Sequence, residues 1–281
     1  MSTGTITVLH PGEMGASIAR AAREAGSRVL WVGTGRGEQT AARARAAGIE
    51  DAGTLARALQ QSDLVLSVCP PDAARAIARE VAASGFDGLY VDANAIAPAT
   101  TREVGAIVSA AGARFVDGGI IGPPVSSAGN TRLFLSGADA GEVAAMFAGS
   151  MLSVQVLEGP DDAASALKMC FAAWTKGSTA LLADIRALAG ALGVEQALLA
   201  QWDSSQPGLG ARSESAACSN AFKAWRWIAE MEEIADTFAA QNLPDGFHRA
   251  AAQIYRRLAG FKDERAPELA QILAALRSPR D

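Results

Sequence analysis

The stretch Ile6-Thr7-Val8-Leu9-His10-Pro11-Gly12-Glu13-Met14-Gly15 decides the fold of this chain. Its first four residues are β-branched or apolar and predict a buried strand. The residues from Met14 to Ala25 predict a helix that ends at Gly26. Because glycines allow a tight turn between the two, we expect a strand–loop–helix unit at residues 6–25.

The same alternation of strands and helices continues through the first half of the chain. It predicts strands at residues 28–32, 64–68, 88–92, 114–117 and 131–136, and helices at 38–47, 72–83 and 101–111. Short apolar runs that alternate with helices imply βαβ units. We therefore expect a parallel sheet covered by helices on both faces, as in a Rossmann domain.

The second half of the chain is helical in pattern. Helices are predicted at residues 163–192, 195–202, 215–240, 246–258 and 267–276, with hardly a strand-like run among them. The change in texture lies near Glu158-Gly159-Pro160. We expect an α/β protein with a Rossmann domain at 1–158, joined by a long interdomain helix to an all-α domain at 159–281.

The composition excludes several classes of protein. The chain has 281 residues, 49% of them hydrophobic, and a formal net charge of −5. An acidic chain lacks the basic footprint of a general nucleic-acid binder, and no apolar run approaches the roughly 20 residues that span a membrane. Three scattered cysteines and two histidines indicate neither a disulfide framework nor a metal site. We expect a cytoplasmic protein that binds no metal, nucleic acid or membrane.

The first loop has the glycines of a dinucleotide-binding turn. Such a turn lets the backbone approach a pyrophosphate and lets the following helix pack closely on the strand. Gly12 and Gly15 occupy the second and third glycine positions, whereas His10 replaces the first. The loop lies within a repeated βαβ pattern, which strengthens the motif. The alternative is a turn with a purely structural role. The residues expected to bind the cofactor here are His10, Pro11, Gly12, Glu13, Met14 and Gly15.

The end of the second predicted strand bears on the choice of cofactor. The loop Val32-Gly33-Thr34-Gly35-Arg36-Gly37 contains no carboxylate before Glu38. A carboxylate here would repel a 2′-phosphate, whereas an arginine in a flexible loop can accept one. We predict NADP, with NAD as second choice, and contacts from Thr34 and Arg36. The alternative is that Arg36 is an ordinary solvated arginine.

Two later loops follow strands at the edge where open α/β sheets bind ligands. They are Cys69-Pro70-Pro71 and Asp92-Ala93-Asn94-Ala95. We expect Cys69, Pro70 and Asn94 to contact the cofactor. Asn94 is equally compatible with an Asx turn.

Several segments recur in the order of a known family. They are the His-x-Gly-x-Met-Gly loop, Val91-Asp92-Ala93-Asn94, Phe115-Val116-Asp117-Gly118-Gly119 and Ala166-Leu167-Lys168-Met169. Together they resemble the β-hydroxyacid dehydrogenase superfamily, which includes 6-phosphogluconate dehydrogenase and the imine reductases. Gly119 to Pro124, Ala173-Trp174-Thr175-Lys176-Gly177 and Ala224-Trp225-Arg226-Trp227 resemble a poorly characterised branch with a 6-phosphogluconate-dehydrogenase-like C-terminal domain.

The resemblance implies a homodimer formed largely by the helical domain, with an active site in the cleft between the domains. It also implies that Lys168 is the general acid or base. A lysine can take or return the hydroxyl proton as hydride moves to or from a nicotinamide. Helical spacing alone puts Lys168 at the edge of an apolar face, where a lysine that snorkels to water is the simpler interpretation. The resemblance favours the catalytic role.

The sequence departs from the superfamily where the substrate is expected. The usual Ser-Gly-Gly after the aspartate is replaced by Ile121-Gly122-Pro123, and the asparagine usual one turn after the lysine is replaced by Phe171. Both changes remove polar contacts and suggest a substrate more apolar than a small hydroxy acid. The residues expected to bind it are Gly119, Ile120, Ile121, Gly122, Phe171, Trp174 and Thr175.

Other conspicuous side chains have simpler interpretations. Lys176 lies opposite the apolar face of its helix, so we expect it to be solvated. The acidic cluster from Glu230 to Asp236 suggests a solvated or salt-bridged helix face rather than a metal site. The aromatic residues of the second domain fit a core or a dimer interface better than a pocket; they are Trp202, Phe222, Trp225 and Trp227.

These observations favour an NADP-dependent dehydrogenase or reductase acting on the hydroxyl/carbonyl pair of a small-molecule substrate. Two alternatives stay open. One is an imine reductase of the same architecture, disfavoured because imine reductases usually place Asp or Tyr at the Lys168 position. The other is a catalytically silent NADP-binding protein, which the missing first glycine and the lost polar residues would suit.

Overall fold

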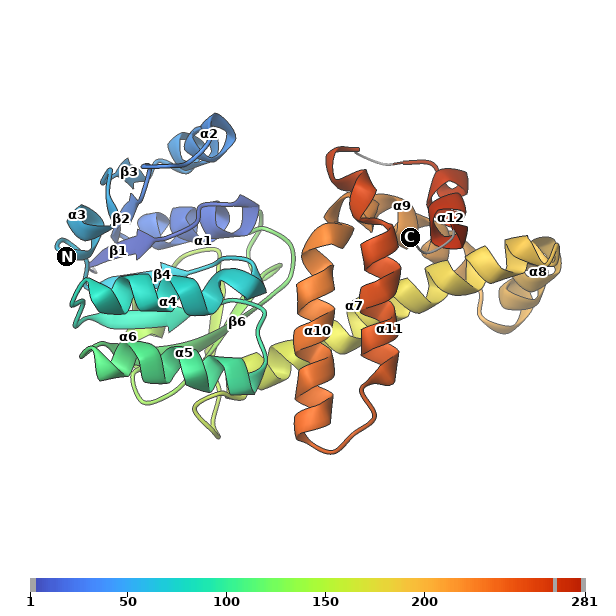
Figure 1. Ribbon diagram of the computed structural model, residues 1–281. Helices are drawn as coiled ribbons and strands as arrows, with labels where there is room; N and C mark the ends of the chain where they lie inside the picture. The colour runs from blue at the N-terminus through green and yellow to red at the C-terminus, as the bar shows by residue number, and fades with distance from the viewer. Residues whose placement is uncertain (1–3, 265–266, 279–281) are drawn as a thin grey trace. The chain divides into compact units, whose positions relative to one another are not determined.

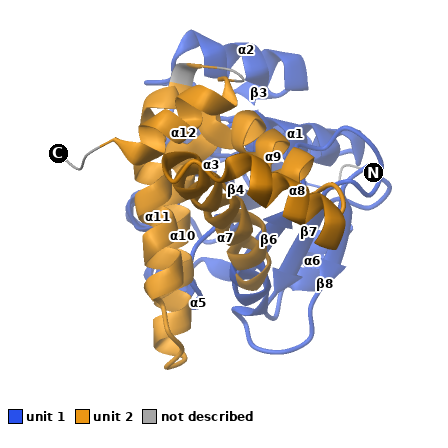
Figure 2. Ribbon diagram, turned by 90° about the vertical axis from the view of Figure 1, so that its right-hand side faces the viewer, with its two compact units in different colours: residues 1–169 blue, residues 170–281 orange. Residues whose placement is uncertain are grey.

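The computed structural model describes residues 4–264 and 267–278. The chain forms two compact units, residues 1–169 and 170–281, shown in different colours in Figure 2. The division falls within one long helix, α7 (Ala163–Ala191). The sequence changes from a mixed to a helical pattern at residues 158–160, before α7 begins. The domain boundary at 158/159 stays a prediction.

Unit 1 contains an eight-stranded sheet in the order β3-β2-β1-β4-β5-β6-β7-β8. Neighbouring strands from β3 to β6 are parallel, in the order 3-2-1-4-5-6 of a dinucleotide-binding domain. This confirms the predicted Rossmann arrangement and places the carboxyl ends of six strands at one edge. The strands are β1 (Thr5–Val8), β2 (Arg28–Trp31), β3 (Glu50–Asp51), β4 (Leu64–Ser67), β5 (Leu89–Asp92), β6 (Arg114–Ile121), β7 (Arg132–Ser136) and β8 (Ser153–Val156).

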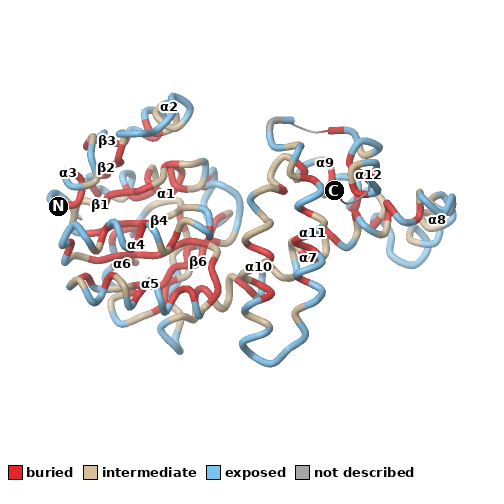
Figure 3. The backbone as a smooth tube through the Cα atoms, in the orientation of Figure 1, coloured by how far each residue is buried: buried red, intermediate tan, exposed pale blue. Residues whose placement is uncertain are grey.

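Two hydrophobic clusters cover the two faces of this sheet. Figure 1 shows the helices beside the strands, and Figure 3 shows the strands as mostly buried. Side chains alternate along each strand, so Leu64 and Leu66 of β4 enter one cluster while Val65 enters the other. The first face is packed by α1 (Glu13–Glu24), α2 (Glu38–Ala47) and α6 (Ala140–Ala145). The second is packed by α3 (Leu55–Leu59), α4 (Ala74–Ala83) and α5 (Pro98–Ala110). The buried face of α1 is rich in alanine, which lets this helix approach the sheet closely.

Unit 2 is helical throughout its described residues. After α7 come α8 (Glu195–Ser205), α9 (Leu209–Asn220), α10 (Ala224–Ala240), α11 (Gly246–Arg257) and α12 (Leu269–Arg277). The helices α10 and α11 lie side by side as a hairpin (Figure 1). Among the described residues, no helix is long and apolar enough to cross a membrane.

The structure corrects several sequence predictions. The sheet is not wholly parallel, because β7 runs antiparallel to β6. The predicted helix at 215–240 is two helices, α9 and α10, separated by a 3-10 turn at Ala221–Lys223. The strand predicted at 114–117 extends to Ile121. The elements β3, α3, α6 and β8 were not predicted, because segments of two to six residues are too short to show a periodicity.

Candidate active site

The two glycines at the junction of β1 and α1 differ in the space around them. A Cβ on Gly15 would lie 2.4 Å from the carbonyl oxygen of His10, so only glycine lets α1 begin this close to the strand. A Cβ on Gly12 would meet nothing within 4 Å. Gly12 is the N-cap of α1 and has no side chain to accept from the first-turn amides. Open space beside uncapped helix amides fits a bound pyrophosphate.

The structure brings His10 and Arg36 together. The Arg36 guanidinium lies 2.7 Å from Nε2 of His10, across the loops that follow β1 and β2. Burial, and secondarily the Arg36 charge, lower the pKa of His10 to about 4, so the imidazole is neutral at pH 7. Because the Arg36 guanidinium can only donate, Nε2 of the neutral ring accepts and the ring proton is on Nδ1. That Nδ1 is buried and has no hydrogen-bond partner among the described residues.

Two charged residues that the sequence reasoning missed also lie at this edge of unit 1. Arg43 of α2 reaches back to the Pro11 carbonyl oxygen at 3.4 Å. Asp51, at the end of β3, accepts from the amide of Gly33 at 3.0 Å and of Gly53 at 2.7 Å. A carboxylate therefore does lie beside the end of β2, although it belongs to another strand. Neither residue has a local sequence signal, because each reaches the loop only through the tertiary fold.

The loops after β4 and β5 are tied together by Asn94. Its Oδ1 accepts from the Cys69 amide at 2.5 Å, and its Nδ2 donates to Ser67 and Asp92 at 3.1 and 2.9 Å. The Asn94 side chain is buried, and its own amide donates to the Asp92 carboxylate, so Asp92 is the residue that closes the Asx turn. Burial raises the pKa of the Cys69 thiol to about 12, which leaves it protonated and unreactive. Pro70 is exposed beside it.

Lys168 lies at the carboxyl end of β6. Its Nζ donates to the carbonyl oxygen of Ile120 at 2.7 Å. A Cβ on Gly119 would lie 2.6 Å from the Ala164 carbonyl oxygen and 3.4 Å from Cβ of Lys168, so this glycine lets α7 lie directly on the strand. Three of the residues predicted separately are thus neighbours within unit 1.

Beyond Ile121 the chain leaves the sheet. Ile121 is half-buried and Gly122 is exposed. Gly122 has a φ of 124°, and a Cβ there would lie 2.4 Å from the Asn130 carbonyl oxygen. Backbone geometry therefore requires this glycine for the turn after β6, whatever its relation to a substrate. Thr34, exposed in the loop after β2, uses its amide to donate to Gly53.

The predicted substrate residues of α7 lie in unit 2. Phe171 is 43% exposed and Trp174 is 73% exposed. The Thr175 hydroxyl donates to the Phe171 carbonyl oxygen at 3.1 Å within the helix. Exposed apolar patches of this kind are typical of surfaces that bind a ligand or another protein.

Lys176 is not solvated, so that expectation is wrong. Its Nζ lies 2.5 Å from the Glu230 carboxylate, and both side chains are largely buried, at 13% and 10% exposure. The Lys176 ammonium also lies 5.5 Å from the Trp227 ring centroid. A helical wheel of α7 alone could not show that α10 covers this side. The salt-bridged interpretation of the acidic cluster is confirmed for Glu230 and also for Glu232 and Asp236.

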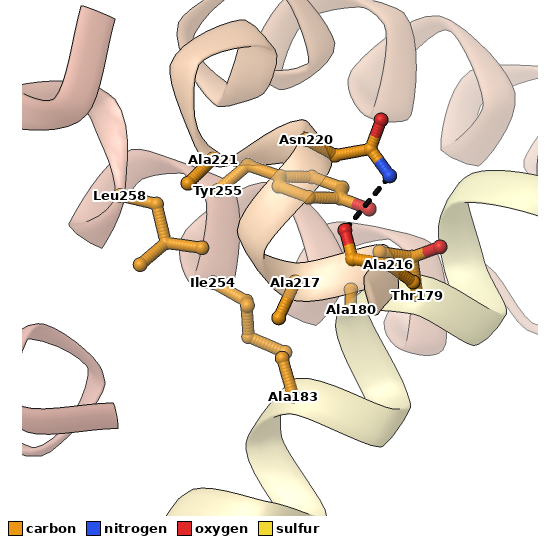
Figure 4. Close-up of a pocket in the computed structure, with 10 residues that line it drawn as sticks. All are labelled: Thr179, Ala180, Ala183, Ala216, Ala217, Asn220, Ala221, Ile254, Tyr255 and Leu258. Carbon is orange, nitrogen blue, oxygen red and sulfur yellow. Dashed lines mark hydrogen bonds between the residues drawn. The ribbon is translucent and has the colours of Figure 1, made fainter. Parts of the chain in front are cut away.

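The other unit-2 aromatic residues lie against their neighbours. Trp227 makes an edge-to-face contact with Tyr255, at 5.1 Å between centroids. Trp225 has the Arg226 and Lys262 cations over its ring at 5.0 and 4.5 Å. Figure 4 shows the small apolar cavity between α7, α9 and α11, of about 10 Å³, which is room for a single water. It is too small for a substrate. Within residues 4–264 and 267–278, no cluster of His, Cys, Asp or Glu has the composition of a metal site.

Comparison with known proteins agrees with this geometry. Residues 5–155 match the family described as the NAD binding domain of 6-phosphogluconate dehydrogenase, and residues 189–258 match a domain of unknown function, DUF1932. No curated protein matches the chain. A solved structure of the conserved protein MTH1747, of unknown function and described as similar to 3-hydroxyacid dehydrogenases, is 27% identical. The alignment covers 91% of this chain and 97% of that one, with a TM-score of 0.65.

Two more distant structures share the fold. The Mycobacterium tuberculosis 3-hydroxyisobutyrate dehydrogenase with L-serine is 20% identical over 99% of this chain and 100% of that one, with a TM-score of 0.71. The Aspergillus terreus reductive aminase is 19% identical over 98% and 100%, with a TM-score of 0.54. The match over residues 5–155, together with the Rossmann strand order and the glycine loop after β1, shows that the chain belongs to the 6-phosphogluconate dehydrogenase NAD-binding family of NAD(P)-dependent oxidoreductases.

Proposed function

We propose that the chain is an NADP-dependent enzyme that transfers hydride between the nicotinamide and a hydroxyl/carbonyl carbon of a small substrate. The observation that carries the proposal is the position of Lys168, whose Nζ lies at the Ile120 carbonyl near the carboxyl end of β6. The glycine loop after β1 is at this same edge of the sheet. An ammonium group can act as the general acid for a carbonyl oxygen, and a dinucleotide loop at the same sheet edge suits the hydride-carrying cofactor.

The cofactor would be held by residues of the four loops that follow β1, β2, β4 and β5. The first-turn amides of α1, with the open space over Gly12, suit the pyrophosphate. Arg36, held by its contact with His10, suits a 2′-phosphate. Arg43, which donates to the Pro11 carbonyl oxygen beside His10, adds a second positive charge there. The remaining contacts with the cofactor would come from Thr34, Cys69, Pro70 and Asn94. When bound, the nicotinamide supplies or accepts the hydride.

The Lys168 ammonium would perform the proton chemistry. In the direction of reduction, its Nζ donates a hydrogen bond to the carbonyl oxygen and then gives up a proton to it. In the direction of oxidation, the neutral amine takes the hydroxyl proton. The Ile120 carbonyl holds Nζ at this end of β6 by accepting a hydrogen bond from it.

The substrate is proposed to be more apolar than a small hydroxy acid. The segment from Gly119 to Gly122 has no hydroxyl to hold a carboxylate. Phe171, Trp174 and Thr175, which belong to unit 2, stay predicted substrate residues.

A homodimer through unit 2 is part of the proposal, as is a cytoplasmic location. Large apolar residues recur along the exposed side of α7 and at the residue directly after it, with spacings of three, seven, seven and four: Phe171, Trp174, Leu181, Leu188 and Leu192. A heptad-like stripe of this kind is the pattern by which helices of two chains pack. The Leu192 side chain, at the end of the stripe, is 66% exposed in the monomer.

The first experiment is a separate titration of the protein with NADPH and NADH, followed by tryptophan and nicotinamide fluorescence. Trp31 lies at the end of β2, directly before the loop that carries Arg36, and serves as the reporter. We expect Arg36→Ala to weaken NADPH binding at least tenfold and to leave NADH binding unchanged. Arg45→Ala, at an exposed arginine paired with Glu38, is the matched control. A preference for NADH would contradict the NADP assignment and point instead to Asp51 as a ribose ligand.

The second experiment is a screen of alcohols, carbonyls and cyclic imines with Lys168→Ala beside the wild type. Normal cofactor affinity with turnover reduced at least a hundredfold is expected. Lys262→Ala, at an exposed lysine, is the control. Imine reduction with no activity on any alcohol or carbonyl would assign the chain to imine chemistry. Tight NADPH binding with no turnover on the whole panel would favour a silent binding protein.

A further inference from the structure

A buried carboxylate lies beneath the first turn of the helix that carries Lys168. Asp117 is in β6, is fully buried, and accepts three hydrogen bonds. Its Oδ2 accepts from the Ser165 amide at 2.8 Å and from the Ser136 hydroxyl at 3.1 Å, and its Oδ1 accepts from the Ser165 hydroxyl at 2.5 Å. Ser165 is the third residue of α7, so its amide is one of those that the helix itself cannot satisfy.

The same network closes around the start of α7 from two more elements. The Ser136 hydroxyl, on β7, accepts from the Ala164 amide at 2.9 Å. The Thr101 hydroxyl, on α5, donates to the Ser165 hydroxyl at 2.8 Å. All of these polar side chains are buried. A negative charge at a helix N-terminus interacts favourably with the helix dipole, and charge-assisted hydrogen bonds are stronger than neutral ones.

The geometry links this network to Lys168. Gly119 is two residues beyond Asp117 on the strand, so both face α7 on the same side of the sheet. Lys168 is three residues beyond Ser165 on the helix, so its stem leaves the same helix face. The first turn of α7 is therefore fixed on β6 by the carboxylate of Asp117 at one point and by the close approach at Gly119 at the next.

We propose that Asp117 is the positioning residue for Lys168: by capping the first turn of α7, its carboxylate holds the Lys168 ammonium at the Ile120 carbonyl. The inference rests on the proposed role of Lys168 for its catalytic consequence, while the positioning itself is a property of unit 1 alone. Asp117 touches neither cofactor nor substrate in this scheme, and it acts only through the helix.

Burial raises the pKa of Asp117 to about 6, although the hydrogen bonds from Ser165 and Ser136 oppose the shift and the nearby Asp162 charge adds to it. Asp162 is itself paired with Arg102. A proton on the carboxyl turns one acceptor into a donor, facing groups that are donors already. The position of Lys168 is therefore expected to change as the pH falls through about 6.

The test uses lysines labelled with ¹³C at Cε in the full-length protein, because the chain has four lysines. Each Cε resonance is assigned by one Lys→Arg variant. In Asp117→Asn, we expect the Lys168 resonance to move to the position of an exposed lysine, while Lys176, Lys223 and Lys262 keep theirs. In the wild type, the Lys168 resonance should shift with a midpoint near pH 6, and Asp117→Asn should abolish that transition. Glu103→Gln, at an exposed carboxylate of α5 paired with Arg75, is the matched control.

If Asp117→Asn does not fold, Ser165→Ala removes only one of the three hydrogen bonds and is expected to move the Lys168 resonance in the same direction by less. In turnover, Asp117→Asn should lower kcat at least tenfold and leave NADPH affinity within twofold. A folded Asp117→Asn whose Lys168 resonance is unmoved would overturn the proposal. A wild type without turnover, whose Lys168 resonance still responds to Asp117→Asn, would contradict the proposed function and leave the positioning role intact.

Discussion

Replacing each glycine of the β1–α1 loop by alanine should separate stability from cofactor binding. In Gly15→Ala the new Cβ would lie 2.4 Å from the His10 carbonyl oxygen. Neither atom can rotate away, because Cβ is bonded directly to the backbone and the oxygen is part of it. Restoring even 3.0 Å requires the start of α1 to move by about 0.6 Å. Overpacking of this kind costs about 1–3 kcal/mol. In Gly12→Ala the Cβ meets nothing, and the only expected cost is the loss of a favourable N-cap residue, below about 1 kcal/mol.

Binding should show a different contrast. The space over Gly12 is the space that the pyrophosphate would occupy, so Gly12→Ala should weaken NADPH binding at least tenfold, which is about 1.4 kcal/mol. The stability of unit 1 is measured by urea denaturation, with 5-fluorotryptophan as a ¹⁹F probe, because Trp31 is the tryptophan of residues 1–169. NADPH affinity is measured by fluorescence.

The reasoning fails if Gly12→Ala binds NADPH as the wild type does, because the space over that residue would then hold no phosphate. It fails separately if Gly15→Ala is as stable as the wild type. Gly141→Ala, at a helical glycine in α6 whose Cβ would meet nothing within 4 Å, is the control for the substitution itself. It should be neutral or stabilising by up to about 1 kcal/mol.

Two further predictions concern buried charges. Lys176→Met should destabilise unit 2 by about 3–5 kcal/mol, because it removes the Lys176 ammonium from the largely buried Glu230 carboxylate, and adding Glu230→Leu should recover most of the loss in urea denaturation. For Asp117, the folded-state pKa of about 6 lies above the ordinary 3.8, so the folded protein holds the proton more tightly than the unfolded chain. This contribution to stability is fully present below about pH 4 and is lost as the pH rises through 6. The loss is about 3 kcal/mol, and Asp117→Asn should be missing that part of the pH dependence between pH 4 and 7.

Features of the fold that depend on neighbours in the sequence could be predicted. The strand, glycine loop and helix of residues 5–24 are contiguous, and the alternation of strands and helices predicts the βαβ units of a Rossmann domain. The direction of β7 could not be predicted. A strand of five residues has the same alternation whether it runs parallel or antiparallel to its neighbour.

Side-chain environments were predictable only where the partner is local. Lys176 was expected in water, because its helix was considered alone and the covering residue, Glu230, is 54 residues away. Arg36 was found from its loop, but its contact with His10 joins residues 26 apart and could not be inferred from the loop. The Asp51 carboxylate at the end of β2 could not be predicted from that strand's own loop, because it comes from β3.

The start of α7 joins these arguments. A side chain at position 119 would meet the start of α7, and burial raises the pKa of the Asp117 carboxyl to about 6, so ionising it at pH 7 costs stability. Neither residue is needed to form a helix or a strand, because helices begin more simply with a serine or threonine N-cap. Both bring the backbone of α7 onto β6 and orient one lysine toward the carboxyl edge of the sheet. A stability cost concentrated at one helix start is explained if the position of that lysine matters to the protein more than the stability does.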